Sequence, residues 1–127
     1  MEKTIVELEK PFIDDRGTIQ KILESHSGSC VIISSVKGSQ RANHYHKEDY
    51  HYCYLVSGSI EYFERPVGSD ELPVKYIINP GVLFFTGPMI EHTMYFTEDS
   101  VFITFGGGTR TQADYEDDLV RVASLKD

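Results

Sequence analysis

Three of the five histidines in this 127-residue chain lie within eight positions, at His44, His46 and His51. One residue separates His44 from His46, so on a β-strand both imidazoles point to the same face, about 7 Å apart along it. Converging neutral imidazoles bind transition metals such as Zn, Fe, Ni or Co, whereas Mg and Ca prefer oxygen ligands. Imidazole also moves protons near neutral pH. These residues therefore suit a metal site or acid–base catalysis, unless they lie on a solvated edge strand.

The four residues between His46 and His51, KEDY at 47–50, have the length and polarity of a hairpin loop. Histidines closing such a hairpin would be cross-strand partners on one face, with Cβ atoms about 5 Å apart. A further histidine, His92, follows the turn-like TGPMIE and begins another strand-like run. A closed β fold could bring it to the same place. Spacing alone leaves the metal site, the acid–base pair and the solvated edge open.

Short apolar runs rich in Val, Ile, Tyr and Phe recur along the chain, separated about every 8 to 12 residues by turn-forming residues. They read TIVEL, CVIISSV, YHYCYLVSG, IEYFE, VKYIIN, VLFFTG, HTMYF and VFITF. This pattern is typical of an all-β sandwich or barrel. Gly58 and Ser59 have the place and composition of a two-residue type II′ hairpin turn. The acidic segment TQADYEDDLVRV, 111–122, predicts a short helix or an extended tail packed on the outside.

Length and charge narrow the class of protein. The chain is long enough for one domain, 1–127, and too short for two. Its formal net charge of −8, without a Lys/Arg-rich run, argues against a nucleic-acid partner. No stretch has the roughly 18 apolar residues of a membrane span, and the start lacks the layout of a signal peptide. We therefore expect a cytoplasmic protein without a membrane partner, whose two cysteines stay reduced.

The histidine region resembles the first motif of the cupin superfamily, covering 38–58. That motif runs Gly, five residues, His-x-His, three or four residues, Glu, six residues, Gly. Here the matching positions are Gly38, His44, His46, His51 and Gly58. Every spacing fits, and His51 stands where the family usually has Glu.

A second cupin-like motif covers 81–92. The family pattern runs Gly, five residues, Pro-x-Gly, two residues, His, and here it begins at Gly81 and ends at His92. Gly87 and Met89 replace the usual Pro and Gly. Together the two motifs imply a single-domain, all-β cupin, that is, a double-stranded β-helix or jelly-roll barrel.

The cupin resemblance also implies a metal site. Carried over residue by residue, the family's ligands map onto His44, His46, His51 and His92. The cofactor expected from it is one divalent transition metal, Zn, Fe, Ni, Mn or Co. Four neutral imidazoles would leave the full charge of the ion to act on a bound oxygen.

A narrower resemblance concerns nucleotide-sugar enzymes. PFIDDRGTI is similar to the Phe-x-Asp-x-Arg-Gly opening of rhamnose-pathway epimerases, and RANHYHK is similar to the Arg-Gly-x-His-x-His-Lys run of nucleotide-sugar ketoisomerases. The resemblance implies that Arg16 and Arg41 bind the phosphates and that His44 or His46 carries the proton. Lys47, which also flanks the histidines, is a further candidate for binding an anionic substrate.

Metal binding and proton transfer compete for the same lone pairs. If His44 and His46 bind a metal, they cannot act as bases, and the proton needs another group such as Tyr62 or Glu91. Glu91 would point away from the cavity on a straight strand, although a bulge would change that.

These observations predict a metal-binding isomerase or epimerase of a sugar or nucleotide-linked deoxysugar, acting by enediolate chemistry and forming a homodimer as relatives commonly do. The alternatives are an iron-dependent dioxygenase or a zinc cyclase-type cupin, and a non-catalytic sugar- or anion-binding cupin.

Overall fold

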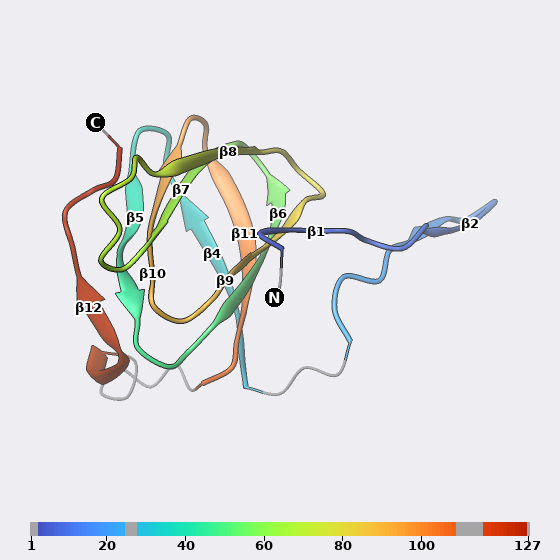
Figure 1. Ribbon diagram of the computed structural model, residues 1–127. Coiled ribbons are helices and arrows are strands. Elements are labelled where there is room, and N and C mark those ends of the chain that lie inside the picture. Colours follow the sequence, from blue (N-terminus) through green and yellow to red (C-terminus); the bar gives the residue numbers. More distant parts are fainter. Residues whose placement is uncertain (1–2, 25–27, 109–115, 127) are drawn as a thin grey trace.

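The computed structural model describes residues 3–24, 28–108 and 116–126 (Figure 1). The all-β prediction is confirmed, because these ranges contain twelve strands and a single helical turn at 116–118. The strands are β1 Ile5–Val6, β2 Phe12–Asp14, β3 Gly17–Ile19, β4 Ser29–Ser35, β5 Gln40–His46, β6 His51–Ser57, β7 Ile60–Pro66, β8 Val74–Ile78, β9 Leu83–Thr86, β10 Ile90–Phe96, β11 Ser100–Gly106 and β12 Leu119–Arg121. No helix in the described part of the chain is both long and apolar enough to cross a bilayer.

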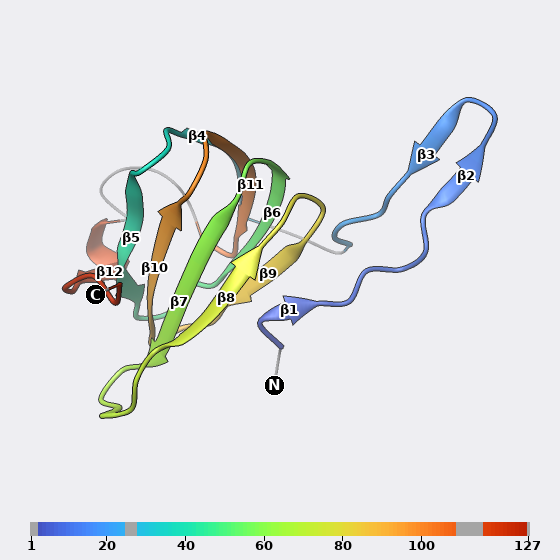
Figure 2. The same ribbon diagram turned by 90° about the horizontal axis from the view of Figure 1, so that it is seen from above.

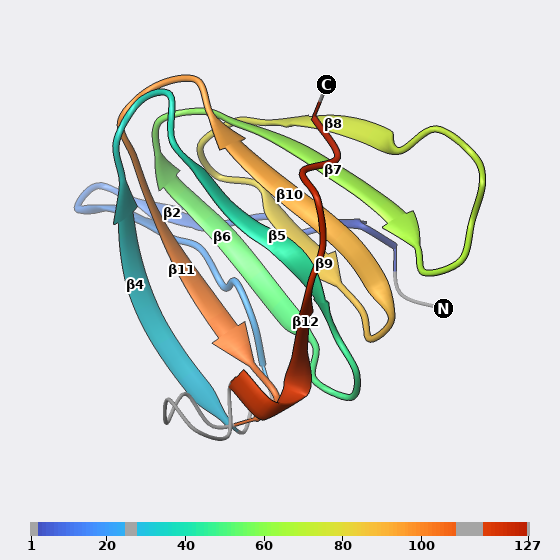
Figure 3. The same cartoon turned by 90° about the vertical axis from the view of Figure 1, so that its left-hand side faces the viewer.

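Two five-stranded antiparallel sheets form the body of the molecule (Figure 3). The first sheet has the order β1-β9-β6-β11-β4, and the second has the order β12-β5-β10-β7-β8. The inner faces of the sheets meet in a core of aliphatic and aromatic side chains. Its completely buried members include Leu55, Ile60, Tyr62, Ile78, Leu83, Phe84, Phe96 and Phe102. This core fixes the spacing of the two sheets and so of any side chains that face each other across it.

Consecutive strands change sheet at two turns that the sequence predicts to be hairpins. β5 belongs to the second sheet and β6 to the first, and β7 returns to the second. The hairpin predictions for KEDY, 47–50, and for Gly58–Ser59 were therefore wrong. A two-layer barrel folds the chain over its edge at these loops, so the flanking strands face each other rather than pair. Gly58 still has the positive φ, 98°, expected of a turn glycine.

The alternation of inward- and outward-facing residues along a strand does not depend on which strands pair. In β11, Phe102 and Thr104 are buried on the inner face, while Val101, Ile103 and Phe105 are half-buried on the outer face. The run VFITF, 101–105, thus carries apolar groups on both faces of the sheet. The first sheet therefore presents an apolar outer surface as well as an apolar core.

Residues 7–24 form an arm that extends away from the body of the molecule (Figures 1 and 2). Its tip is the β2–β3 hairpin, in which Phe12 pairs with Ile19 and Asp14 with Gly17. The side chains of Phe12, Ile13 and Ile19 are exposed. The sequence motif PFIDDRGTI thus lies on a projecting hairpin.

The C-terminal segment adds an edge strand to the second sheet. β12 pairs antiparallel with β5, placing Leu119 opposite His46 and Arg121 opposite His44. Of the acidic segment 111–122, residues 111–115 lie outside the described residues. The remainder combines both predicted forms, a helical turn at 116–118 followed by β12.

Candidate functional site

A cavity of about 220 Å³ lies between the inner faces of the two sheets. Its polar lining comprises Arg41, His44, His51, Tyr62, Thr86, His92 and Thr104, and its apolar lining includes Ile33, Phe84, Met94 and Phe102. A mainly apolar chamber with a few convergent polar groups is the usual form of a small-molecule site.

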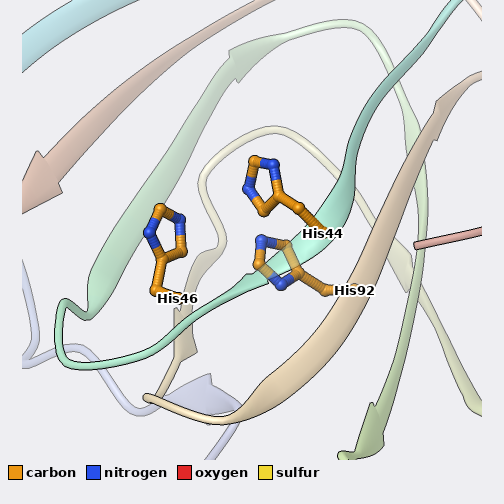
Figure 4. Close-up of side chains that lie close together, drawn as sticks. All are labelled: His44, His46 and His92. Atoms are coloured by element: carbon orange, nitrogen blue, oxygen red, sulfur yellow. The ribbon is translucent and has the colours of Figure 1, made fainter. Parts of the chain in front are cut away.

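Three histidines of the second sheet lie close together (Figure 4), and two of them, His44 and His92, line this cavity. His44 and His46 are two residues apart on β5, and His92 on β10 is the cross-strand partner of His44. The ring centroid of His44 lies 4.8 Å from that of His46 and 4.8 Å from that of His92. One ligand atom from each of the three lies within 4.8 Å of the others. The prediction that the His-x-His pair shares one face and that His92 joins it is confirmed.

Hydrogen bonds fix the tautomers of two of these rings. Nδ1 of His92 donates to the carbonyl oxygen of Ile90 at 2.9 Å, so its Nε2 carries the lone pair. Nδ1 of His46 lies 3.1 Å from Oδ2 of Asp118 and donates to it when that carboxylate is ionised. A second-nitrogen hydrogen bond of this kind orients metal-binding histidines and catalytic histidines alike.

Burial keeps the three rings neutral. Desolvation, followed by repulsion from the other histidines, lowers the pKa of His44 to about 2. Desolvation lowers the pKa of His92 to about 3. The pKa of His46 is also lowered, chiefly by burial and by His51, although Asp118 opposes the shift. A neutral imidazole is the form that binds a metal ion or accepts a proton.

His51 approaches the group from the opposite sheet. It opens β6, and its ring centroid lies 4.5 Å from that of His46. Its Nε2 lies 3.4 Å from Oδ2 of Asp49. Burial of the Asp49 carboxyl acts to raise its pKa, but contacts with His51 and with two backbone N–H groups lower it to about 2. His51 is thus paired with an ionised carboxylate.

Tyr62, which the sequence suggests as a group that could move the proton, forms part of the cavity wall. Its hydroxyl donates to Oε1 of Glu64 at 3.0 Å and also contacts the hydroxyl of Thr86. Burial and the neighbouring Glu64 charge raise the pKa of Tyr62 well above its ordinary value. The phenol therefore keeps its proton at neutral pH.

Arg41 also lines the cavity, because a bulge in β5 changes which side chains face inward. Ala42 and Asn43 have left-handed backbones, with φ of 72° and 55°, and the pairing with β10 shifts register there. On a regular strand Arg41 would face away from His44. Instead its guanidinium Nε donates to Oγ of Ser35 on β4 at 2.6 Å. This places an exposed cation at the cavity mouth.

The other sequence candidates lie elsewhere. The described residues that line the cavity do not include Glu91, which pairs with Arg65 at 3.2 Å. Lys47 lies in the exposed loop after β5, beside a surface groove that Glu48 also lines. Arg16 lies on the projecting arm and pairs with Asp14 at 2.7 Å.

Two carboxylates of the site, Asp49 and Asp118, are absent from the sequence-based candidates. Asp118 is 72 residues from its partner His46 and reaches it only because β12 pairs with β5. In the sequence, the only indication of these two carboxylates was the acidic residues in KEDY and YEDDL. Acidic loop residues are common, so they carry no chemistry until the topology places them beside imidazoles.

Solved structures resemble this chain in fold, whereas no protein-family model and no curated protein matches its sequence. A 3,4-ketoisomerase from Helicobacter canadensis has a TM-score of 0.75 and 18% identity, over 92% of this chain and 88% of that chain. QdtA, a sugar 3,4-ketoisomerase from Thermoanaerobacterium thermosaccharolyticum in complex with TDP, has a TM-score of 0.70 and 21% identity. The match covers 95% of this chain and 90% of that chain. A mutant of QdtA was solved with TDP-4-keto-6-deoxyglucose.

CapF, a capsular polysaccharide assembling protein from Staphylococcus aureus, has a TM-score of 0.67 and 20% identity over 91% of this chain. The match covers 34% of CapF, so the chain spans about a third of that protein. These likenesses establish the fold and confirm the predicted cupin barrel.

Proposed function

We propose that this protein is a sugar isomerase or epimerase that moves a proton at a carbon next to a carbonyl group, with nucleotide-linked deoxysugars as the substrate class. The observation that carries the proposal is a pair of histidine–carboxylate contacts beside one cavity, His46–Asp118 and His51–Asp49. A carboxylate partner of this kind orients an imidazole for proton transfer or for binding a metal ion. The ketoisomerases of the same fold support the substrate class, since structures of QdtA contain TDP or TDP-4-keto-6-deoxyglucose.

The cavity supplies what isomerisation of a hydroxy-ketone requires. An imidazole accepts the proton of the carbon beside the carbonyl, and the electron pair of that bond forms an enediolate. The hydroxyl proton moves to the former carbonyl oxygen, and the imidazole returns its proton at the neighbouring carbon. Tyr62 keeps its proton and can donate to an oxygen that gains negative charge. Arg41 offers a cation for the diphosphate at the mouth. The apolar lining strengthens these charge interactions.

We further propose that His44, His46 and His92 bind one divalent transition metal ion. The fit rests on ligand atoms within 4.8 Å of one another, neutral rings, and Nδ1 hydrogen bonds that leave Nε2 as the basic nitrogen of His46 and His92. When bound, the ion supplies a Lewis acid for the carbonyl oxygen. An imidazole set suits Zn, Fe, Ni, Mn or Co.

The activity is tested with TDP-4-keto-6-deoxyglucose in D₂O, followed by proton NMR. We expect loss of the signal of the carbon-bound proton beside the carbonyl and the appearance of an isomer. Asp118→Asn and Asp49→Asn should slow this exchange, while Asp117→Asn, an exposed neighbour, serves as the matched control. Binding of the nucleotide sugar without exchange would indicate a non-catalytic sugar-binding protein instead.

The metal proposal is tested by elemental analysis of protein purified without added metal. We expect about one transition-metal ion per chain, lost in His44→Ala and in His92→Ala. Full occupancy in both variants would contradict the site, and circular dichroism shows whether each variant remains folded.

We also propose that the protein is a homodimer. The arm exposes Phe12 and Ile19, and the outer face of the first sheet exposes Ile32 and Val56. Apolar groups on a projecting arm and on an open sheet face favour a second copy of the same chain. Arg16, which lies far out on the arm, could then act as a phosphate contact at the partner's cavity. Light scattering should give twice the chain mass of 14.5 kDa, and Phe12→Ser with Ile19→Ser should lower it. A monomeric wild-type protein would contradict this arrangement.

A further inference from the structure

The ring of His51 is held differently from the other three histidines of the site. Within the described residues, two groups have ligand atoms within 4.8 Å of one another, His44 with His46 and His92, and His46 with Asp49 and Asp118, and His51 belongs to neither. His51 faces His46 from the opposite sheet, and its Nε2 lies 3.4 Å from Oδ2 of Asp49. The structure therefore separates three histidines from one.

The Asp49 carboxylate is itself fixed in place. Its Oδ1 accepts hydrogen bonds from the backbone N–H of Tyr50 at 2.8 Å and of Gly108 at 2.9 Å. The backbone N–H of Asp49 donates to Oδ2 of Asp118 at 3.2 Å. The loop after β5 and Gly108 thus hold the Asp49 carboxylate, and Asp118 of the helical turn at 116–118 holds the Asp49 backbone. Oδ2 is turned toward His51 as a result.

The His51 ring also packs directly against the backbone of Gly106. A Cβ atom at Gly106 would lie 2.7 Å from Cδ2 of His51 and 2.9 Å from its Nε2. These distances are too short for real contacts, so the ring occupies space that any larger residue at 106 would take. The orientation of His51 is therefore fixed by a carboxylate on one side and a glycine backbone on another.

From these contacts we infer that the metal centre consists of His44, His46 and His92 alone, and that His51, oriented by Asp49, contacts the substrate. This inference rests on the proposed metal site and isomerase activity. Nε2 of His51 lies 3.4 Å from the ionised Asp49 carboxylate, which favours the proton on Nε2 and makes Nδ1 the basic nitrogen. The carbon–hydrogen bond breaks, its proton passes to Nδ1, and the electron pair enters the enediolate. The hydroxyl proton moves to the former carbonyl oxygen, and the proton on Nδ1 returns at the neighbouring carbon as the new carbonyl forms.

The arrangement resolves the competition for lone pairs within this cluster. A histidine that binds a metal through its lone pair has none left for a proton. His46, whose Nδ1 contacts Asp118, then has the oriented geometry of a metal ligand. His51 has an equivalent carboxylate partner but stands outside the ligand group. Asp118 and Asp49 are thus positioning residues for two different tasks.

Cobalt(II) absorption tests the ligand set without reference to activity. The chelator-treated protein is titrated with Co(II), and the visible absorption bands report the ligands directly. We expect His51→Gln to bind one Co(II) per chain with the wild-type spectrum. His92→Gln, the matched ligand variant, should lose the bands or shift them. Circular dichroism and thermal melting show that both variants are folded.

Exchange kinetics test the second half of the inference. In the D₂O assay, His51→Gln should lower kcat by about 100-fold or more. Asp49→Asn should lower kcat by about 10- to 100-fold with little change in KM and an unchanged cobalt spectrum. Glu48→Gln, an exposed residue of the same loop, should leave both measurements unchanged.

The possible failures are distinguishable. A weakened or shifted cobalt spectrum in His51→Gln would overturn the three-histidine assignment while leaving the metal site itself intact. Wild-type exchange rates in His51→Gln would overturn its contact with the substrate. A wild-type protein that binds no Co(II) would refute the proposed metal site, and the three-histidine centre with it. A wild-type protein that binds Co(II) but catalyses no exchange would refute the proposed isomerase and the substrate role of His51, but not the ligand set.

Discussion

Acid should destabilise the metal-free protein through two buried histidines. A histidine in the unfolded chain has a pKa near 6.5, whereas burial holds the pKa of His44 at about 2 and that of His92 at about 3. Between these values the unfolded chain binds more protons than the folded protein. The free energy of unfolding therefore falls as the pH falls below 6.5. The lowered pKa of His46 acts in the same direction.

The size of this effect follows from the same values. Between pH 7.5 and pH 5.5, each of the two histidines stays neutral in the folded protein and becomes protonated in the unfolded chain. Each therefore removes about 1.4 kcal/mol from the free energy of unfolding, and the two together about 2.7 kcal/mol. Asp49, whose pKa is about 2, remains ionised throughout this range in the folded protein. A loss of this size is a large part of the roughly 5 to 15 kcal/mol that stabilises a typical domain.

Urea unfolding of the chelator-treated protein at pH 7.5, 6.5 and 5.5 measures the effect. The midpoint should move by about 1 M or more over this range. In His44→Gln the loss between pH 7.5 and 5.5 should be smaller by about 1.4 kcal/mol, while changes in net charge affect both proteins alike. Equal stability at pH 7.5 and 5.5, or greater stability at 5.5, would refute the reasoning.

Three substitutions test other parts of the structure. Gly106→Ala should displace the His51 ring and lower the free energy of unfolding by about 1 to 3 kcal/mol, measured by urea unfolding; unchanged stability would contradict the close approach. Gly58→Ala should lower the melting temperature, because φ is 98° and a Cβ there would collide with Ser100; a melting temperature equal to wild type would argue against this turn. Tyr62→Phe should cost about 1 to 3 kcal/mol by removing the hydrogen bonds of its hydroxyl with the buried Thr86 and the half-buried Glu64, again measured by urea unfolding; a gain in stability would exclude the hydroxyl contacts.

The sequence was sufficient to predict which histidines converge but not how they are brought together. Strand parity placed His44 and His46 on one face, and the motif spacing added His92. The hairpin expected between His46 and His51 is instead a crossing between sheets. A four-residue polar loop fits both connections, because it fixes the distance between strand ends and not which edges pair. A hairpin and a crossing between sheets both bring the rings of His46 and His51 close together. The predicted proximity of these two histidines was therefore right although the predicted strand pairing was wrong.

The supporting carboxylates could not be predicted for a different reason. Asp118 acquires its role from the pairing of β12 with β5, a contact across 72 positions of the chain. Periodicity reports the face of a residue within its own strand, not its partner in another strand. Asp49 was assigned to a polar hairpin loop, and the backbone contacts with Tyr50 and Gly108 hold its carboxylate beside His51. Pairwise contacts of this kind require the fold.

The bulge in β5 divides that strand into two parts that can vary separately. Residues 44–46 are held in register by β12 on one side, and His44 pairs with His92 on the other. Residues 40–42 pair with β10 in a shifted register and carry Arg41 to the mouth. Under the proposed function, changes of charge or length before Ala42 would alter which anionic group is recognised without moving the histidines. Selectivity for the proposed substrate could then evolve, or be redesigned, independently of the histidine cluster.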